Sequence, residues 1–187
     1  MRKMGKGSFI YLLPFGGLEQ VDLGEVVKEI EKEFGIPVKI HNCGIDPEPF
    51  FDASRKQYHS TRILKEILNN LPPDATKAVG LVPFDLFIPI LTFVFGEAQL
   101  DGKVAIVSTA RLRQEYYGLP PNPRLLHRRL VKEIKHELGH TFGLVHCPLR
   151  ECVMSVANNI SDVDSKGITF CEGCRETLRQ KLRDLHR

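Results

Sequence analysis

The chain has 187 residues, of which 42% are hydrophobic and 26% charged, a composition typical of globular proteins. This composition excludes a disordered, collagen-like or low-complexity chain. The formal net charge of +3 is too small to indicate a polyanionic partner by itself. At about 150 residues per domain, the length suits one compact unit that a cleft can divide into two lobes.

The first half of the chain alternates strand-like and helix-like segments. Apolar runs predict five strands, at residues 8–14, 37–40, 79–82, 92–98 and 104–108. Amphipathic stripes predict two helices, at residues 21–34 and 59–71. This alternation favours an α/β sheet with right-handed crossovers. Only residues 99–103, with the turn dipeptide Asp101-Gly102, separate the last two strands, so that pair is predicted to be antiparallel and the sheet mixed.

A long helix is predicted in the second half of the chain. Asn122 is expected as its N-cap and Pro123 as its first residue. Apolar residues recur every four positions from Leu126 to Leu138 and form a core-facing stripe. Beyond Gly143 the chain is rich in cysteine and poor in regular pattern, until residues 175–187 predict a terminal amphipathic helix.

No segment has the pattern of a membrane span or a secretion signal. The most apolar stretch, residues 81–95, contains Asp85 and two prolines and is shorter than the ~20 residues that cross a bilayer. Two buried strands joined by a turn are expected there instead. The apolar run at residues 9–13 is short and ends at Pro14, so it is expected to be the first strand rather than a signal peptide.

The strongest motif is H-E-L-G-H-T-F-G-L-V-H at residues 136–146. Residues four apart on a helix differ by about 40° around its axis, so His136 and His140 present their imidazoles to one point. Gly143 can adopt the left-handed conformation that ends the helix and returns His146 as a third ligand. The alternative for H-E-x-x-H alone is an exposed or carbonyl-bonded histidine pair. The full pattern arises by chance in roughly 10⁻⁴ of such chains.

Three neutral imidazoles would leave a zinc ion its full charge and an open fourth position, where a water becomes acidic. Glu137 follows the first of these histidines directly. Its carboxylate is expected to take the proton of that water during attack on a peptide carbonyl, and then to pass it to the departing amine. The motif therefore predicts a catalytic zinc site with Glu137 as general base.

Four of the five cysteines follow this motif closely, at Cys147, Cys152, Cys171 and Cys174. Four thiolates make a closed, structural zinc site in a reducing compartment, with a disulfide as the alternative. Adjacent residues in an extended segment point in opposite directions, so His146 and Cys147 are expected to serve two separate ions. Loss of the structural ion is expected to weaken the catalytic one. Cys43 has no evident partner.

These motifs resemble those of the archaemetzincins, a branch of the metzincin zinc metalloproteases. The resemblance is carried by the histidine motif, the spacing from Cys147 to Cys152, Met154, and C-E-G-C at residues 171–174. The interval between Met154 and Cys171 is about one residue shorter than in the family. The resemblance implies two zinc ions per chain. The implied site residues are His136, His140 and His146 for catalytic zinc, Glu137 as base, and Cys147, Cys152, Cys171 and Cys174 for structural zinc.

The resemblance also implies a Met-turn and a fold. Met154 would lie beneath the histidines as an apolar floor, and an ordinary core methionine is the alternative. The expected fold is α/β (α+β) and metzincin-like: a mixed, twisted five-stranded sheet with two backing helices and an active-site helix. Residues 1–143 would form the N-terminal subdomain and residues 144–187 a zinc-stapled C-terminal subdomain. A strand at residues 93–99 would bind extended substrate antiparallel at the cleft edge.

We therefore expect a zinc-dependent metallopeptidase that acts on peptides or unfolded protein as a cytoplasmic monomer, without a nucleic-acid or membrane partner. The alternative is a zinc-stabilised peptide- or nucleic-acid-binding module with little or no catalysis. Glu137 discriminates the two, because a purely structural site needs no carboxylate beside its first ligand. Exopeptidase and endopeptidase activity both fit the motif.

Basic clusters, a loop and three further histidines are weaker functional candidates. The basic clusters at residues 124–135 and 175–187 are interpreted as solvated helix faces rather than nucleic-acid contacts. Residues 111–117, which include Arg111, Arg113, Tyr116 and Tyr117, are interpreted as a solvated loop, with a cleft lining as the alternative. His41, His59 and His127 lack the spacing of metal ligands.

Overall fold

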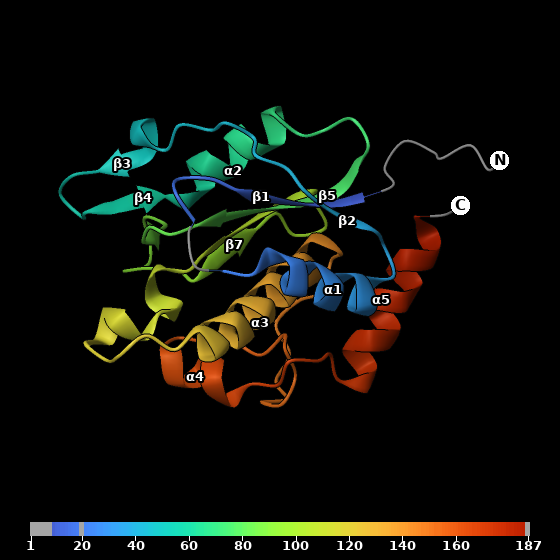
Figure 1. Ribbon diagram of the computed structural model, residues 1–187. Helices are drawn as coiled ribbons and strands as arrows, with labels where there is room; N and C mark the ends of the chain where they lie inside the picture. Colours follow the sequence, from blue (N-terminus) through green and yellow to red (C-terminus); the bar gives the residue numbers. More distant parts are fainter. Residues whose placement is uncertain (1–8, 19–20, 186–187) are drawn as a thin grey trace.

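The computed structural model describes residues 9–18 and 21–185, and its main feature is a twisted five-stranded sheet (Figure 1). In spatial order the strands are β2 (Val38–Ile40), β1 (Phe9–Pro14), β5 (Ala75–Val82), β8 (Val104–Ser108) and β7 (Gly96–Ala98). Neighbouring strands from β2 to β8 are parallel, and β7 is antiparallel to β8. The expected mixed sheet is confirmed, with β7 at its edge.

Five α-helices accompany this sheet among the described residues: α1 (Leu23–Phe34), α2 (Ser60–Asn69), α3 (Pro123–Thr141), α4 (Ile160–Ser165) and α5 (Glu172–Asp184). Short 3-10 turns occur at Glu48–Phe50, Ala110–Leu112 and Gln114–Tyr117. Residue 8 of the expected first strand and residues 186–187 of the expected last helix lie outside the described residues. None of the described helices combines the length and apolarity of a membrane span.

Helices cover both faces of the sheet, because successive strand side chains point to opposite sides. Ile10 and Leu12 of β1 pack in one core with α1 and α3. Tyr11 and Leu13 pack in a second core with Ile63 and other residues of α2. The two helices expected to back the sheet therefore lie on its opposite faces (Figure 1). Helix α3 shares its face with α1.

A second, three-stranded sheet was not predicted from the sequence. It consists of β3 (Phe51–Asp52), β4 (Gln57–His59) and β6 (Leu86–Phe87). These strands are too short to produce a periodic hydrophobic pattern. The strand expected at residues 92–98 begins only at Gly96, and the preceding segment contributes an isolated bridge between Leu86 and Val94. The two buried strands expected within residues 81–95 are therefore present only in part, as the end of β5 and the two-residue strand β6.

Helix α3 begins and ends at local signals. The Asn122 side chain accepts a hydrogen bond from the Leu125 amide at 3.0 Å, and Pro123 occupies the first turn. At the other end, Gly143 adopts φ 85°, and the Leu144 amide donates to the Gly139 carbonyl at 3.0 Å. These contacts confirm the expected N-cap and the expected glycine stop.

Three basic residues of α3 correct the expectation of a solvated face, whereas Arg124 and Arg128 are exposed as expected. Arg129, Lys132 and Lys135 are buried, with 5%, 1% and 2% of their surfaces exposed. Arg129 forms two bonds with the Asp164 carboxylate, and the Lys135 ammonium lies 3.0 Å from Glu33. Because α3 packs between the sheet, α1 and the C-terminal segment, these cations hold the surrounding chain instead of facing solvent.

Candidate metal centre and cleft

Three histidines converge where α3 ends. The Nε2 atoms of His136 and His140 are 3.1 Å apart. The turn at Gly143 brings the His146 ring to 5.3 Å and 4.8 Å from the rings of His136 and His140, measured between centroids. One nitrogen from each imidazole lies within 4.8 Å of the other two. The structure thus gathers three nitrogen donors from one helix and its following turn.

Backbone carbonyls orient two of these imidazoles. His136 Nδ1 lies 2.9 Å from the Val153 carbonyl oxygen, and His140 Nδ1 lies 2.8 Å from that of Leu144. A carbonyl only accepts, so Nδ1 carries the hydrogen and Nε2 presents a lone pair. Two such lone pairs at 3.1 Å repel each other unless a cation lies between them. Tetrahedral zinc with Zn–N bonds near 2.0–2.1 Å requires about 3.3–3.4 Å between nitrogens, so the donor set fits zinc.

Burial also favours the neutral, metal-binding form of each imidazole. Desolvation lowers the pKa of His136 well below its ordinary value, and the nearby Lys166 charge lowers it further. Desolvation by burial is also the main cause that lowers the pKa values of His140 and His146. All three residues are therefore unprotonated near neutral pH, as metal ligands must be.

Glu137 borders the same cleft and is almost completely buried, with 5% of its surface exposed. Burial raises its pKa well above the usual carboxyl value, and the charges of Glu133 and Glu97 raise it further. Gly96 of the edge strand makes room for this side chain. A Cβ on Gly96 would lie 2.7 Å from both Glu137 Oε1 and the Ile106 carbonyl oxygen. Sequence reasoning did not single out Gly96.

The cleft has a volume of about 600 Å³. One wall is the segment that leads into β7, and the other comprises Val145, His146 and residues 156–158. Its rim includes the exposed apolar side chains of Leu91 and Val156. Glu97 on β7 is bonded to Thr61 Oγ1 at 2.8 Å, at the N-terminus of α2, which ties the cleft edge to that helix.

Two charged residues of the cleft, Glu133 and Lys166, were not predicted as site residues. Glu133 lies one helical turn before His136, so its helical spacing was a signal that the sequence offered. Lys166 is distant in sequence, and no local pattern links it to the histidine motif.

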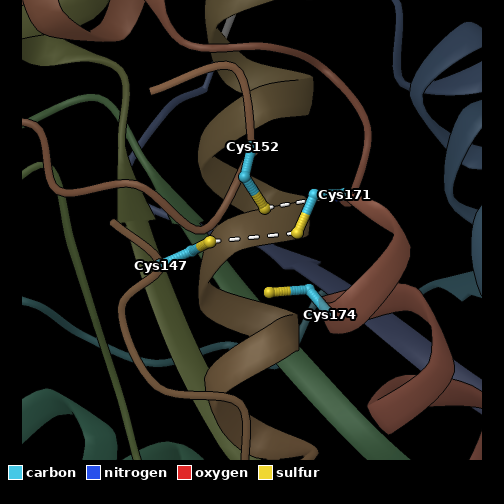
Figure 2. A group of neighbouring side chains, drawn as sticks. All are labelled: Cys147, Cys152, Cys171 and Cys174. Carbon is cyan, nitrogen blue, oxygen red and sulfur yellow. Dashed lines mark hydrogen bonds between the residues drawn. The ribbon is translucent and has the colours of Figure 1, made fainter. Parts of the chain in front are cut away.

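Four cysteines form a second cluster, supplied by the segment after His146 and by the start of α5. Figure 2 shows their sulfur atoms pointing toward a common centre. The sulfurs of Cys147 and Cys171 are 3.8 Å apart, and the Cys171 amide donates to Cys152 Sγ at 3.3 Å. All four thiols are free, so the disulfide alternative is not supported. Tetrahedral zinc with Zn–S bonds of 2.3 Å requires sulfurs about 3.8 Å apart, which fits this donor set.

The N-terminus of α5 favours the thiolate form of one of these residues. The Cys174 amide hydrogen bond is the largest influence that lowers the pKa of Cys171. Cys171 is also the N-cap residue of the helix. The cluster therefore includes a sulfur whose charged, metal-binding form the backbone stabilises.

A short backbone segment connects the two clusters. The Cys147 amide donates to the Met154 carbonyl at 2.9 Å, and the neighbouring Val153 carbonyl contacts His136 Nδ1. Met154 is fully buried in the core that includes α3. The cysteine cluster thus contacts the Val153–Met154 backbone segment, which also orients His136.

None of the remaining candidates belongs to the histidine cluster found among the described residues. Arg111 forms two 2.8 Å bonds with Asp85, and its guanidinium carbon lies 3.9 Å from the Phe93 ring centroid, so the solvated-loop interpretation is wrong for Arg111. Tyr116 and Tyr117 are exposed. Cys43 and the histidines at 41, 59 and 127 join neither metal-ligand group found among the described residues.

Residues 61–180 match the sequence model of Peptidase family M54. The chain is 43% identical over 162 residues to the archaemetzincin of Methanocaldococcus jannaschii, covering 84% of this chain and 87% of the relative. It is 42% identical over 159 residues to the archaemetzincin of Pyrococcus horikoshii, covering 82% and 84%.

Solved structures of related proteins are also similar to this chain over most of its length. The crystal structure of archaemetzincin from Methanopyrus kandleri aligns with a TM-score of 0.84 and 35% identity over 98% of each chain. The structure of a zinc-dependent peptidase from Methanocorpusculum labreanum aligns with a TM-score of 0.79 and 33% identity, over 90% of this chain and 99% of that one.

Proposed function

The chain belongs to Peptidase family M54 and is a zinc metallopeptidase of the archaemetzincin type, and we propose how its own residues divide the work of peptide-bond hydrolysis. The observation that carries this proposal is the convergence of three lone-pair nitrogens within 4.8 Å beside a buried carboxyl group in one cleft. Family membership favours this function over the zinc-stabilised binding module.

The catalytic zinc would be held by the Nε2 atoms of His136 and His140 and by the His146 imidazole. Bound there, zinc supplies a Lewis acid that polarises the scissile carbonyl. The Val153 and Leu144 carbonyls fix the two helix imidazoles in the tautomer that leaves Nε2 available. The protein therefore presents the donors without first reorganising them.

Glu137 would act as the general base and then as the general acid. Its carboxylate takes a proton from the attacking water, holds it on a carboxyl oxygen, and delivers it to the nitrogen of the departing amine. The raised pKa of this buried carboxyl stabilises the protonated intermediate form of the side chain. The same burial excludes bulk water from the transferred proton.

The peptide would bind in extended form along β7, antiparallel to that strand. Among the described residues, β7 pairs within its sheet with β8 alone, and it borders the cleft. Main-chain bonds to such an edge tolerate many sequences, because side-chain identity does not affect them. The apolar rim, which includes Leu91 and Val156, would cover the side chains of the peptide.

The second zinc would be structural and held by Cys147, Cys152, Cys171 and Cys174. We propose that residues 1–143 and 144–187 act as two subdomains, one supplying β7 and the zinc helix, the other supplying His146 and the opposite wall. The thiolate site stabilises the second subdomain, which has little regular structure before α5.

Peptide cleavage by wild-type protein and by Glu137→Ala, compared at equal zinc content, tests this function. We expect the wild type to cleave peptides from an unbiased library and the variant to lose at least about 10²-fold in rate. Mass spectrometry of the digest identifies the scissile bonds. Equal rates for the two proteins would remove the role of Glu137, and no cleavage by either would favour the binding module.

We also propose that the protein acts as a cytoplasmic monomer without nucleic acid. Four free cysteines in one cluster suit a reducing compartment. Light scattering coupled to size-exclusion chromatography checks the oligomeric state, and the absorbance ratio of the purified protein at 260 and 280 nm checks for bound nucleic acid.

A further inference from the structure

A buried ion pair lies in the cleft, one helical turn before the histidine site. Glu133 precedes His136 by three positions and Glu137 by four, so it lies on the same face of α3. Lys166 follows α4, and its Nζ lies 2.7 Å from Oε1 of Glu133. The side chain of Lys166 is 1% exposed and that of Glu133 is 3% exposed, yet both residues border the cleft.

Lys166 Nζ and Glu133 Oε1 contact each other as an ion pair at 2.7 Å, and neither atom has a hydrogen-bond partner among the described residues. Among the buried side-chain atoms of the described residues, only Lys166 Nζ, Glu133 Oε1 and His59 Nδ1 have no hydrogen-bond partner. An ammonium offers three donors, and a carboxylate oxygen accepts about two bonds. The cleft therefore contains an unused donor beside an unused acceptor.

A buried ion pair in this state lowers the stability of the fold. The free energy of removing the two charges from water exceeds their attraction unless further hydrogen bonds to both groups offset it. The ion pair between Arg129 of α3 and Asp164 of α4 has such additional hydrogen bonds. Arg129 makes two bonds to Asp164, at 2.7 and 2.6 Å, and a third to the Leu112 carbonyl at 2.7 Å. The pair of Glu133 and Lys166 has no such bonds, and it borders the space that a substrate would enter.

The backbone around Lys166 is held firmly in place. Lys132 Nζ donates to the Val163 and Asp164 carbonyls at 2.8 and 2.9 Å, which fixes the end of α4 just before Lys166. On the other side, a Cβ on Gly167 would lie 1.9 Å from the Glu151 carbonyl oxygen. Groups fixed in this way discriminate between ligands, because binding does not need to order them.

We propose that Glu133 and Lys166 form a subsite that selects a primary carboxamide, the side-chain group of Asn or Gln, on a substrate residue next to the scissile bond. The carboxamide oxygen accepts from Lys166 Nζ, and its NH₂ group donates to Glu133 Oε1. One neutral group thus supplies a hydrogen-bond partner to both Lys166 and Glu133. This inference rests on the proposed function, which puts the scissile carbonyl at the three histidines.

Other side chains complete the subsite less well. A carboxylate pairs with Lys166 but brings a like charge to Glu133, and an ammonium does the reverse. An apolar side chain buries both charges without satisfying either. Sites built to bond a polar group reject analogues that lack it more strongly than apolar pockets reject misfits.

Ligand binding, measured without turnover, tests the subsite. The probes are three peptide hydroxamates that differ only in the side chain next to the chelating group: Gln, Glu or Leu. Calorimetric titration of the zinc-loaded protein should show the Gln ligand binding at least about 10-fold more tightly than the other two. Equal or tighter binding of the Glu or Leu ligand overturns the subsite alone. Failure of all three to bind overturns the subsite together with the proposed function.

A double variant tests the residues themselves. Single substitutions leave one buried charge uncompensated and destabilise the fold, whereas Glu133→Leu with Lys166→Met replaces the pair by apolar groups. We expect this variant to retain its zinc, to lose the Gln preference and to favour the Leu ligand. Arg129→Leu with Asp164→Asn is the matched control, because it removes another ion pair between α3 and the C-terminal segment, and it should keep the Gln preference. A Glu133/Lys166 double variant that still prefers Gln overturns the proposal, and the ligand series on wild-type protein decides the question if the variant does not fold.

Discussion

Gly139 lies against Met154 with no room for a methyl group between them: a Cβ on Gly139 would lie 2.5 Å from Met154 Sδ and 3.2 Å from the Phe170 ring. Each residue of this contact adjoins the metal centre, because Gly139 precedes His140 and Met154 follows Val153, whose carbonyl contacts His136. The close approach of the helix to the segment beneath it therefore helps to set the position of both imidazoles.

Gly139→Ala should destabilise the protein and loosen the histidine site. Met154 is fully buried, so it cannot move aside freely, and overpacking of this kind costs about 1–3 kcal/mol. Thermal unfolding and zinc affinity by chelator competition measure the two effects. Gly173→Ala in α5 is the control, because an added Cβ there meets nothing within 4 Å. Wild-type stability and zinc affinity in Gly139→Ala would show that the contact is not restrictive.

Gly96→Ala should impair catalysis more than metal binding. The added methyl would lie 2.7 Å from Glu137 Oε1, and it cannot turn away because the Ile106 carbonyl oxygen lies equally close. A displacement of the base by about 1 Å can cost about 10²-fold in kcat. The measurements are kcat on a peptide that the wild type cleaves and zinc content by atomic absorption. A variant with full zinc and the wild-type kcat would contradict the steric argument.

Cys171→Ser should weaken zinc binding at the histidines, although Cys171 is not a ligand there. Loss of the thiolate site frees Cys147, whose amide bonds to the Met154 carbonyl next to the carbonyl that orients His136. Loss of such an orienting partner typically costs about 10–100-fold in metal affinity. Chelator competition measures the affinity, and Cys43→Ser, outside the cluster, is the control. Unchanged affinity in Cys171→Ser would mean that the two sites are independent.

The stability of the protein should rise with pH above about 8 because of Lys77. Burial lowers the pKa of this ammonium to about 8, and its Nζ donates to the Thr141 and Gly102 carbonyls at 2.6 Å each. Between that value and the ordinary lysine value the unfolded chain holds the proton that the folded chain has lost. Raising the pH through this window therefore stabilises the fold, by at most about 1.4 kcal/mol per pH unit.

Denaturant unfolding of the wild type and Lys77→Met between pH 7 and 10 isolates this contribution. The stability of the wild type relative to Lys77→Met should increase with pH across the window. A difference that stays constant or falls would show that the Lys77 pKa is not depressed in the folded protein.

The zinc helix could be predicted almost residue by residue, because each of its signals is local. The N-cap at Asn122, the proline at Pro123 and the left-handed turn at Gly143 act within a few residues of the chain. The helical repeat alone brings His136 and His140 to one face. Strands β1 and β8 were equally readable, since continuous apolar runs mark them, whereas β5 begins at Ala75, four residues before its predicted start.

The surroundings of that helix were decided by tertiary structure. Lys132 and Arg129 look like residues of a solvated face, yet their partners lie more than 30 positions away on α4. The contact between Glu133 and Lys166 and the fit of Gly96 against Glu137 are likewise made by residues far apart in the sequence. Sequence periodicity records which residues share a face of one element, and it contains no information on which distant element covers that face. The sequence by itself therefore determined the ligands and the helix that carries them, and only the packing of distant segments decided which charges line the cleft.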